Sequence, residues 1–318
     1  MVRLDYEEFK EFCIKNVVKA LGEDKYEAVP ILIHKTDEIA FDSVQIVEKD
    51  MEEGRIPSFR IEPYYEAYCG GKALGQVLRD IVKNMEELLA IPIDVVDLSI
   101  FRAFDNAKNN LIIRPISYTD NKKLLEEHVY KPLGDVAVVL YMLMQRSSES
   151  MGTAKLSKIT TDEWGLSDDF LLQVALENTA SLFPPFILPF ERAFQGAKSF
   201  SQIPIQNKLF MNPLIQFELL SSGFDTYVLG IDKGINGASA VFYPGALERI
   251  ASFLNDDLYL ALPCIREAMV HPVAKSGLNA IHRSAKKMFS VLDPMERLTP
   301  YIYHYSRPEQ KLRMLEVD

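Results

Sequence analysis

The feature that most constrains the fold is a run of nine consecutive apolar residues from Val136 to Met144. A helix that spans a bilayer needs about 20 such residues, so the run indicates a segment buried in a protein core. A polar stretch follows it, and then come a strand-like segment from Gly152 to Ile159 and a helical pattern from about Ser167 to Ser181. This order predicts a hairpin followed by a helix, and it predicts no membrane crossing.

The same order of elements recurs later in the chain. We expect strands from Tyr227 to Ile231 and from Gly237 to Tyr243, a turn at Lys233 to Asn236 between them, and a helix that begins at Pro244. In both places the second strand begins with a glycine and a small residue. These similarities indicate a weak internal repeat, although hairpin-plus-helix units also arise without duplication.

The N-terminal third has its own pattern of helices and strands. Asp5 and Glu8 have the spacing of a capping box, which predicts a helix that continues to Leu21. Segments rich in β-branched residues predict a meander of strands, and two helical patterns follow them. The expected strands are 29–34, 39–47 and 59–61, and the expected helices are 74–85 and 95–107. We expect these two helices to cover one face of the meander.

The C-terminal part predicts strands at 258–262, 268–271 and 301–305 and a helix at about 276–291. Strands joined by hairpins and mixed with helices predict an α+β fold with largely antiparallel sheets, built from hairpin-plus-helix units with helices packed on one face. Residues 183–223 contain five prolines and lack a clean period. We therefore predict an N-terminal α+β unit at 1–182, a Pro-rich connecting segment at 183–223 and a C-terminal α+β module at 224–318.

The composition is that of a folded globular protein, with 48% hydrophobic and 25% charged residues. The 35 Lys and Arg residues against 45 Asp and Glu residues give a net charge of −10, which disfavours nucleic acid as a partner. The segment from Met1 to Glu8 is too acidic for a signal peptide, and Cys13, Cys69 and Cys264 lack the spacing of a disulfide framework or a zinc site. These features predict a cytoplasmic protein with reduced thiols.

No residue pattern in the chain defines a reaction. The five histidines are His34, His128, His271, His282 and His304. No two of them have the i, i+4 spacing of a helical metal site, and no G-x-S-x-G motif occurs. The glycines at Gly234 and Gly237 lie between two expected strands, where they predict a hairpin turn rather than a phosphate-binding loop. We therefore expect no metal site, no cofactor and no recognisable catalytic centre.

Glu163 and Trp164 are the first candidate site residues. They belong to the segment from Asp162 to Gly165, which combines two adjacent carboxylates with the only tryptophan of the chain. If the carboxylates flank a cleft, one of them can act as a general acid or base after a pKa shift. The alternative is that the acids cap a helix entry and Trp164 is buried in the core. We favour this alternative because adjacent residues rarely point at one site.

Tyr64 is a candidate of a different kind, because it lies in the aromatic and acidic segment from Glu62 to Tyr68. Aromatic side chains are enriched in protein interfaces, so this segment is a candidate contact surface for a protein partner. A helix entry that packs Tyr65 and Tyr68 on the sheet explains the segment equally well. Ordinary sheet packing is also what we expect of the alternating tyrosines in the last strand, Tyr301, Tyr303 and Tyr305.

Two strings in the chain resemble a known family. The first comprises Trp164-Gly165-Leu166-Ser167, Ala175-Leu176-Glu177-Asn178-Thr179 and Leu182-Phe183-Pro184-Pro185, and the second comprises Asn236-Gly237-Ala238, Tyr243-Pro244-Gly245 and Leu247 to Ile250. Less specific matches are Tyr6-Glu7-Glu8-Phe9, Pro63-Tyr64-Tyr65, Tyr68, Gly70-Gly71 and Tyr303. Together they resemble the bacterial family catalogued as domain of unknown function 5688. The resemblance implies kinship and an intracellular bacterial setting, without a mechanism.

The chain departs from the family pattern after the expected strand from Leu258 to Leu262. Where the family carries Ser-Ser-Ile-His-Glu, this sequence has Cys264-Ile265-Arg266-Glu267. A general-base or metal role for that histidine therefore does not carry over to this chain. The acidic residue of the pattern, Glu267, is retained.

We expect a cytoplasmic binding or regulatory protein that takes a protein partner or a small ligand and does not enter a membrane. The candidate binding residues are Glu163, Trp164, Arg266, Glu267 and Tyr64. The alternative is a hydrolase or transferase in which carboxylates such as Glu163 and Glu267 act with Arg266 in a cleft between the two halves of the chain. A deep polar pocket would favour the enzyme, and a flat apolar patch would favour the binding protein.

Overall fold

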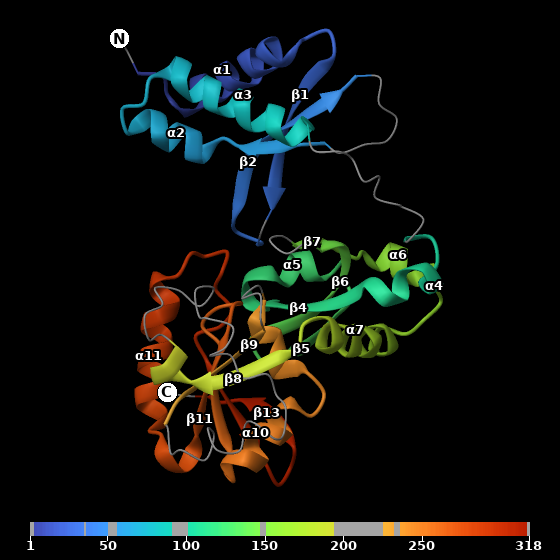
Figure 1. The fold of residues 1–318 in the computed structure, drawn as a ribbon, viewed down its shortest axis with the longest axis vertical. Coiled ribbons are helices and arrows are strands. Elements are labelled where there is room, and N and C mark those ends of the chain that lie inside the picture. Colours follow the sequence, from blue (N-terminus) through green and yellow to red (C-terminus); the bar gives the residue numbers. More distant parts are fainter. Residues whose placement is uncertain are drawn as a thin grey trace. The chain divides into compact units, whose positions relative to one another are not determined.

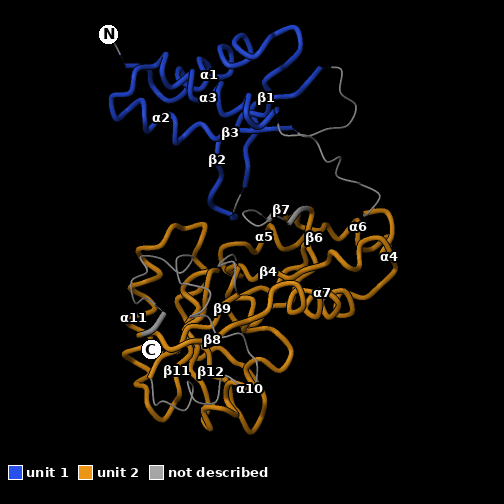
Figure 2. Tube along the Cα trace, viewed as in Figure 1, with its two compact units in different colours: residues 1–97 blue, residues 98–318 orange. Residues whose placement is uncertain are grey.

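The computed structural model describes residues 3–34, 36–49, 56–90, 101–146, 151–193, 225–231 and 236–316 (Figure 1). The chain separates into two compact units, residues 1–97 and residues 98–318 (Figure 2). Each unit has a hydrophobic core of its own.

Unit 1 is a three-stranded antiparallel sheet with helices. The sheet has the order β1-β2-β3, from β1 (Tyr26–His34), β2 (Ala40–Glu48) and β3 (Ser58–Arg60), which confirms the predicted meander. The helices are α1 (Tyr6–Leu21), α2 (Glu62–Cys69) and α3 (Leu74–Ala90). The predicted capping box is present at the start of α1, where the Asp5 side chain accepts the Glu8 amide and the Glu8 side chain accepts the Asp5 amide.

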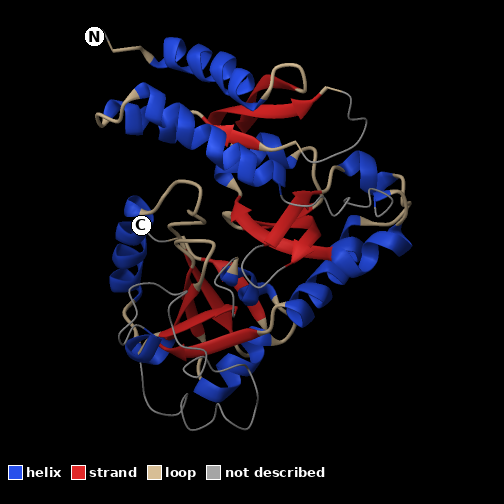
Figure 3. Cartoon of the chain, turned by 45° about the horizontal axis from the view of Figure 1, so that its top comes forward, coloured by secondary structure: helices blue, strands red, loops and turns tan. Residues whose placement is uncertain are grey.

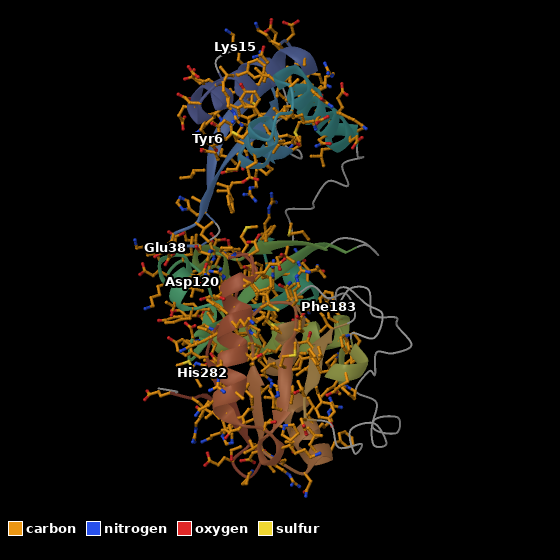
Figure 4. The ribbon with its side chains drawn as sticks, turned by 90° about the vertical axis from the view of Figure 1, so that its left-hand side faces the viewer. Tyr6, Lys15, Glu38, Asp120, Phe183 and His282 are labelled. Atoms are coloured by element: carbon orange, nitrogen blue, oxygen red, sulfur yellow. The ribbon has the colours of Figure 1, made fainter. Side chains whose placement is uncertain are left out.

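The core of unit 1 lies between one face of this sheet and the helices. Apolar residues at helical spacing in α1 and α3, such as Phe9 and Ile81, pack with Val44 and Ile46 of β2. Tyr6 on α1 (Figure 4) extends the contact, because its hydroxyl donates a hydrogen bond to Asp42 of β2 at 3.1 Å. The helices therefore cover one face of the sheet, as predicted for the helical pattern that became α3.

The second expected helix, at 95–107, is not part of this cover. Residues 91–100 lie outside the described residues, and the part of the pattern that is described forms the short α4 (Phe104–Ala107), which belongs to unit 2. Its Phe104 packs beside Trp164 rather than on the meander.

Unit 2 contains two antiparallel sheets, whose strands form two groups in Figure 3. The four-stranded sheet has the order β4-β6-β5, with β7 also paired to β6; its strands are β4 (Leu111–Ser117), β5 (Tyr130–Leu133), β6 (Val136–Arg146) and β7 (Met151–Lys155). The six-stranded sheet has the order β13-β12-β10-β11-β9-β8; its strands are β8 (Pro185–Pro189), β9 (Tyr227–Ile231), β10 (Leu258–Ala261), β11 (Ala268–Pro272), β12 (Ile302–Ser306) and β13 (Lys311–Met314). Together with the helices, they confirm an α+β fold with largely antiparallel sheets.

The helical elements of unit 2 connect and cover these sheets. Besides α4, they are η2 (Lys108–Asn110), η3 (Thr119–Asn121), α5 (Lys122–Leu125), α6 (Lys158–Asp162), α7 (Asp168–Leu182), α8 (Phe190–Ala193), η6 (Gly237–Phe242), α10 (Ala246–Leu254), η7 (Val273–Lys275) and α11 (Leu278–Val291). Of the helices expected here, those near 167–181 and 276–291 are confirmed as α7 and α11.

The two sheets of unit 2 pack face to face between α7 and α11. Along β6, Val139 and Tyr141 join the cluster that contains residues of both sheets, whereas Val138 and Leu140 join the cluster that contains α7. The strands of the second sheet alternate in the same way, and their other face packs on Ile281 of α11. The run from Val136 to Met144 is apolar throughout because both faces of β6 are buried, one against the second sheet and the other against α7.

The structure corrects the expected internal repeat. Residues 237–242 form the 3-10 helix η6 and not the second strand of a hairpin. The physical reason is that both edges of β9 are already paired, one with β8 and the other with β11, so no edge remains for the following segment. Residues 232–235, where the hairpin turn was expected, lie outside the described residues.

The compact units do not divide the chain at the Pro-rich segment. The division falls between residues 97 and 98, and residues 185–189 form β8, an edge strand of the six-stranded sheet. Residues 194–224 of the expected connecting segment lie outside the described residues. Prolines are compatible with β8 because an edge strand leaves one row of backbone groups unpaired.

Candidate functional site

A cavity of about 440 Å³ lies in unit 2, where several elements of the fold converge. Its walls come from β5, β6, α7, η6, α10 and the β12–β13 hairpin. Small-molecule sites in proteins are concave and usually occupy about 300–1,000 Å³. The cavity therefore has the size of a site for a small ligand.

The walls are mainly apolar. Leu172 and Leu176 come from α7, and the side chain of its N-cap residue, Ser167, accepts a hydrogen bond from the Phe170 amide. Val241 is supplied by η6 and Leu247 by α10. Between these two helices the chain turns at Gly245, whose φ of 70° is a left-handed conformation that glycine adopts without strain. On either side of this turn, both helices pack in the cluster that contains residues of the two sheets.

Two tyrosine side chains, Tyr243 and Tyr305, place hydroxyl groups in the cavity wall. Tyr243 shares a hydrogen bond with Ser239 at 3.3 Å, and burial raises the pKa of Tyr243 to about 12. Tyr305 is only 5% exposed, and its hydroxyl has no hydrogen-bond partner in the part of the chain that the structure describes. Burial, and after it the charge of Glu248, raises the pKa of Tyr305. Both hydroxyls are therefore neutral at physiological pH and can donate or accept a hydrogen bond.

The rim of the cavity carries the charged groups. The Gln310 side-chain amide donates to Glu248 Oε1 at 3.0 Å, and Lys131 Nζ lies 3.0 Å from Asp169 Oδ1. Lys131 and Asp169 are both well exposed to solvent. The arrangement offers hydrogen bonds and charge at its margin, and it places no nucleophile next to a base among the described residues of the cavity wall.

The loop between β10 and β11 holds a second group of polar residues, which includes the predicted Arg266 and Glu267. Cys264 Sγ donates to Glu267 Oε1 at 3.4 Å, and burial raises the pKa of the Cys264 thiol to about 12. Burial also raises the pKa of Glu267, whose other carboxyl oxygen is buried without a hydrogen-bond partner in the described residues. Arg266 forms an ion pair with Glu296. A thiol with so high a pKa is not a ready nucleophile.

Asn236 lies beside this loop and was missed by sequence reasoning, which assigned it to a hairpin turn. A Cβ atom on Gly237 would lie 2.0 Å from the Arg266 carbonyl oxygen. The backbones at Gly237 and Arg266 are therefore so close that only glycine, which has no Cβ atom, fits at position 237. Asn236 itself is 4% exposed and has a left-handed backbone, and neither polar atom of its side chain has a hydrogen-bond partner in the described residues. The dipeptide Asn-Gly was the available signal, but it does not distinguish a hairpin from this approach.

Glu163 and Trp164 lie in the same unit, after α6. Glu163 is the C-cap of α6, whereas Ser157 and Ser167 cap the starts of α6 and α7. The expectation that the acids cap a helix entry is therefore wrong. Trp164 is partly rather than largely buried, and its indole N–H donates to the Phe101 carbonyl at 3.1 Å.

Tyr64 lies in unit 1, on α2. Its hydroxyl accepts a hydrogen bond from the Asn84 side chain at 2.7 Å, and its ring packs edge-on against Phe59 at 5.9 Å. The neighbouring Tyr65 and Tyr68 pack on Phe9 of α1, with ring centroids 5.3 and 5.4 Å apart, in the cluster that also contains residues of β2 and β3. Tyr64 also lines an open cavity of about 550 Å³ with Arg60.

The predicted site residues thus fall in three places. Arg266 and Glu267 lie together in the β10–β11 loop, Glu163 and Trp164 follow α6, and Tyr64 is on α2. Within the described ranges, no hydrogen bond or ion pair joins Glu163 to Arg266 or Glu267. The described residues also include no cluster of His, Cys, Asp and Glu side chains suited to a metal ion.

Comparison with known families completes the description of the site. The model of the family described as Family of unknown function (DUF5688) matches residues 6–307. The chain belongs to this family. The match confirms the resemblance, and it spans both units and every wall of the 440 Å³ cavity except the residues after 307.

The other comparisons add no relative. No curated protein and no solved structure is significantly similar to this DUF5688 chain. Among the described residues, no helix has the length and apolar character that crossing a bilayer requires.

Proposed function

We propose that this DUF5688 chain is a binding protein whose 440 Å³ cavity takes a small, mainly apolar molecule. The observation that carries the proposal is the combination of apolar walls, such as Leu172, Val241 and Leu247, with a Tyr305 hydroxyl that has no partner among the described residues. Ligand sites typically combine an apolar lining with a few polar groups that orient the ligand. Tyr305 supplies such a group at the cavity wall.

Binding accounts for the cavity better than catalysis does. A general acid or base works best with a pKa near the operating pH. The buried titratable groups of the wall are Tyr243 and Tyr305, and the pKa of each is raised. They support the recognition of a ligand rather than proton transfer to it.

We also place the protein in the bacterial cytoplasm. Cys13 and Cys264 are buried free thiols, and Cys69 is an exposed one. Free thiols persist in reducing compartments. The family resemblance supports the bacterial setting, and fractionation of the native cells with detection of the protein would test both statements.

The binding proposal is tested by filling the cavity. Leu176→Trp places a large ring in the wall, whereas Gln173→Trp places the same ring on the exposed face of α7. Native mass spectrometry of the purified chain, before and after incubation with 4-phenylbutan-1-ol, should show a complex with the wild type and the Gln173→Trp variant. Loss of this complex in Leu176→Trp supports the proposal, and equal binding by all three proteins contradicts it.

A second candidate function is hydrolase or transferase chemistry at Glu267. The observation that favours it is the raised pKa of Glu267 together with its buried carboxyl oxygen, which has no partner among the described residues. Such a carboxyl can keep its proton and act as a general acid. The test is turnover of model ester, amide and phosphate substrates that is abolished by Glu267→Gln, and absence of any turnover by the wild type removes this candidate.

A further inference from the structure

We propose that the ligand of the 440 Å³ cavity is a hydrophobic amine, with its apolar body between α7 and α10 and its cationic group beside Glu248 and Tyr305. This inference rests on the proposed function, because it names the class of molecule that the same cavity takes. It is carried by the arrangement of charges and aromatic rings around the cavity.

Glu248 gives the cavity an uncompensated negative charge. Its carboxylate accepts a hydrogen bond from the neutral Gln310 side chain at 3.0 Å, and within the described part of the chain it has no ion-pair partner. Glu248 lies in the first turn of α10, where the helix dipole stabilises a negative charge. Glu248 is exposed at the margin of the cavity, so its carboxylate is open to a cation that enters from solvent.

The positive charge on the rim does not balance Glu248. Lys131 Nζ lies 3.0 Å from Asp169, and both side chains project into solvent, with exposed fractions of 69% and 83%. A pair of this kind presents little net charge to a ligand, and the surrounding water screens it. An anionic ligand would thus have to compete with Asp169 for Lys131, whereas a cationic ligand finds Glu248 without a competing cation among the described residues.

Aromatic residues reinforce the preference for a cation. Phe242, Tyr243 and Tyr305 all line the cavity. The faces of aromatic rings are electron-rich and attract ammonium groups, with a benefit that grows when the site excludes water. The Tyr305 hydroxyl, which has no hydrogen-bond partner among the described residues, can accept a hydrogen bond from an ammonium N–H.

The inference predicts a ranking among molecules that share one apolar body. The probes are 4-phenylbutylamine, 4-phenylbutan-1-ol and 4-phenylbutyrate, which are a cation, a neutral molecule and an anion near neutral pH. Isothermal titration calorimetry at low ionic strength should give affinities that fall in that order. The amine should bind about tenfold more tightly than the alcohol, because a carboxylate contact and a cation–π contact together provide a benefit of this size. Added salt should reduce the advantage of the amine.

Two variants assign the preference to Glu248. Glu248→Gln removes the charge and should reduce the advantage of the amine over the alcohol to the smaller part that the aromatic rings supply, while the affinity for the alcohol stays unchanged. Glu309→Gln is the matched control, because it removes one negative charge from an exposed position that does not line the cavity. It should leave the ranking intact.

The outcomes separate this inference from the proposed function. Equal affinities for all three probes, tightest binding of the butyrate, or an amine preference that is undiminished in Glu248→Gln would each overturn the hydrophobic amine while leaving a binding cavity. Absence of binding by all three probes, at concentrations that saturate an ordinary small-molecule site, would overturn the proposed function and this inference with it.

Discussion

Tyr303 and Asp135, which are 168 residues apart in the chain, meet through a hydrogen bond that joins the two sheets of unit 2. The Asp135 amide donates to the Tyr303 hydroxyl at 3.1 Å, and that hydroxyl donates to the Leu133 carbonyl at 2.8 Å. One phenol group on β12 thus forms hydrogen bonds with one amide and one carbonyl of the β5–β6 turn. Leu133 and Tyr305, on either side of this link, also line the 440 Å³ cavity, so the link holds together two of its walls.

Tyr303→Phe should therefore destabilise the protein. The substitution keeps the ring and leaves the Asp135 amide and the Leu133 carbonyl without their partner, which costs about 1–3 kcal/mol. Chemical denaturation followed by circular dichroism measures the loss. Tyr301→Phe is the control, because Tyr301 is 39% exposed on the same segment and should lose almost nothing. Equal losses for the two variants would contradict the role of the hydroxyl.

Gly237→Ala tests the close approach of η6 to the β10–β11 loop. The added Cβ would lie 2.0 Å from the Arg266 carbonyl oxygen, and both atoms are held by backbone, so we expect a loss of about 3 kcal/mol or more. Gly277→Ala, whose Cβ would meet no atom within 4 Å, should change stability by no more than about 0.5 kcal/mol. Thermal unfolding of both variants gives the comparison, and a tolerated Gly237→Ala would show that the loop yields.

The elements with a local signal were predicted from the sequence. The hairpin that contains β6 and the capping box at Asp5 and Glu8 depend on neighbours close in the chain, and both are confirmed. The helix of residues 167–181 was equally visible because its N-cap, Ser167, precedes an apolar stripe. Such features need no knowledge of the tertiary structure.

The features that depend on distant residues were not predicted. Gly237 to Tyr243 has the composition of a strand, but β9 has no free edge to pair with it, and that fact follows only from the positions of β8 and β11. The 440 Å³ cavity was missed for the same reason, because its walls come from residues between 131 and 312. Arg266 and Glu267 are adjacent in the chain, whereas the placement of Glu163 after α6, away from the β10–β11 loop, depends on the tertiary structure.

His271 predicts how stability depends on pH. Burial lowers the pKa of His271 from its ordinary value of 6.5 to about 4. Between these two pH values the unfolded chain binds a proton that the folded chain does not, so stability falls as the pH falls from 6.5 to about 4. A shift of this size corresponds to about 3 kcal/mol.

The contribution of His271 is isolated by substitution. His271→Gln retains a hydrogen-bonding side chain for Thr226, which lies 3.1 Å from the imidazole. The variant should show a weaker dependence of the unfolding free energy on pH between about pH 4 and pH 6.5. Burial and Lys286 also lower the pKa of His282 on α11 (Figure 4), so part of the slope should remain. His34→Gln, at an exposed position, should leave the slope unchanged. An unaltered slope in His271→Gln would contradict the prediction.

Glu267 should act in the opposite direction. Burial raises its pKa above the ordinary value of 4.5, so just above pH 4.5 the folded chain retains a proton that the unfolded chain has lost. The number of protons bound is then larger in the folded state, and the contribution of Glu267 to stability falls as the pH rises through the window between the two pKa values. Glu267→Gln, which imitates the protonated side chain, removes this effect.

The measurement is the unfolding free energy of the wild type and of Glu267→Gln from pH 4.5 upward. The substituted glutamine keeps a hydrogen-bond acceptor for the Cys264 thiol, which lies 3.4 Å from Glu267 Oε1, so the difference between the two proteins reports the charge rather than a lost contact. Relative to the wild type, the variant should gain stability as the pH rises. Glu163→Gln is the control, because Glu163 is exposed at the end of α6, and it should show no such gain. If the difference in unfolding free energy between Glu267→Gln and the wild type were the same at every pH, the prediction would be wrong.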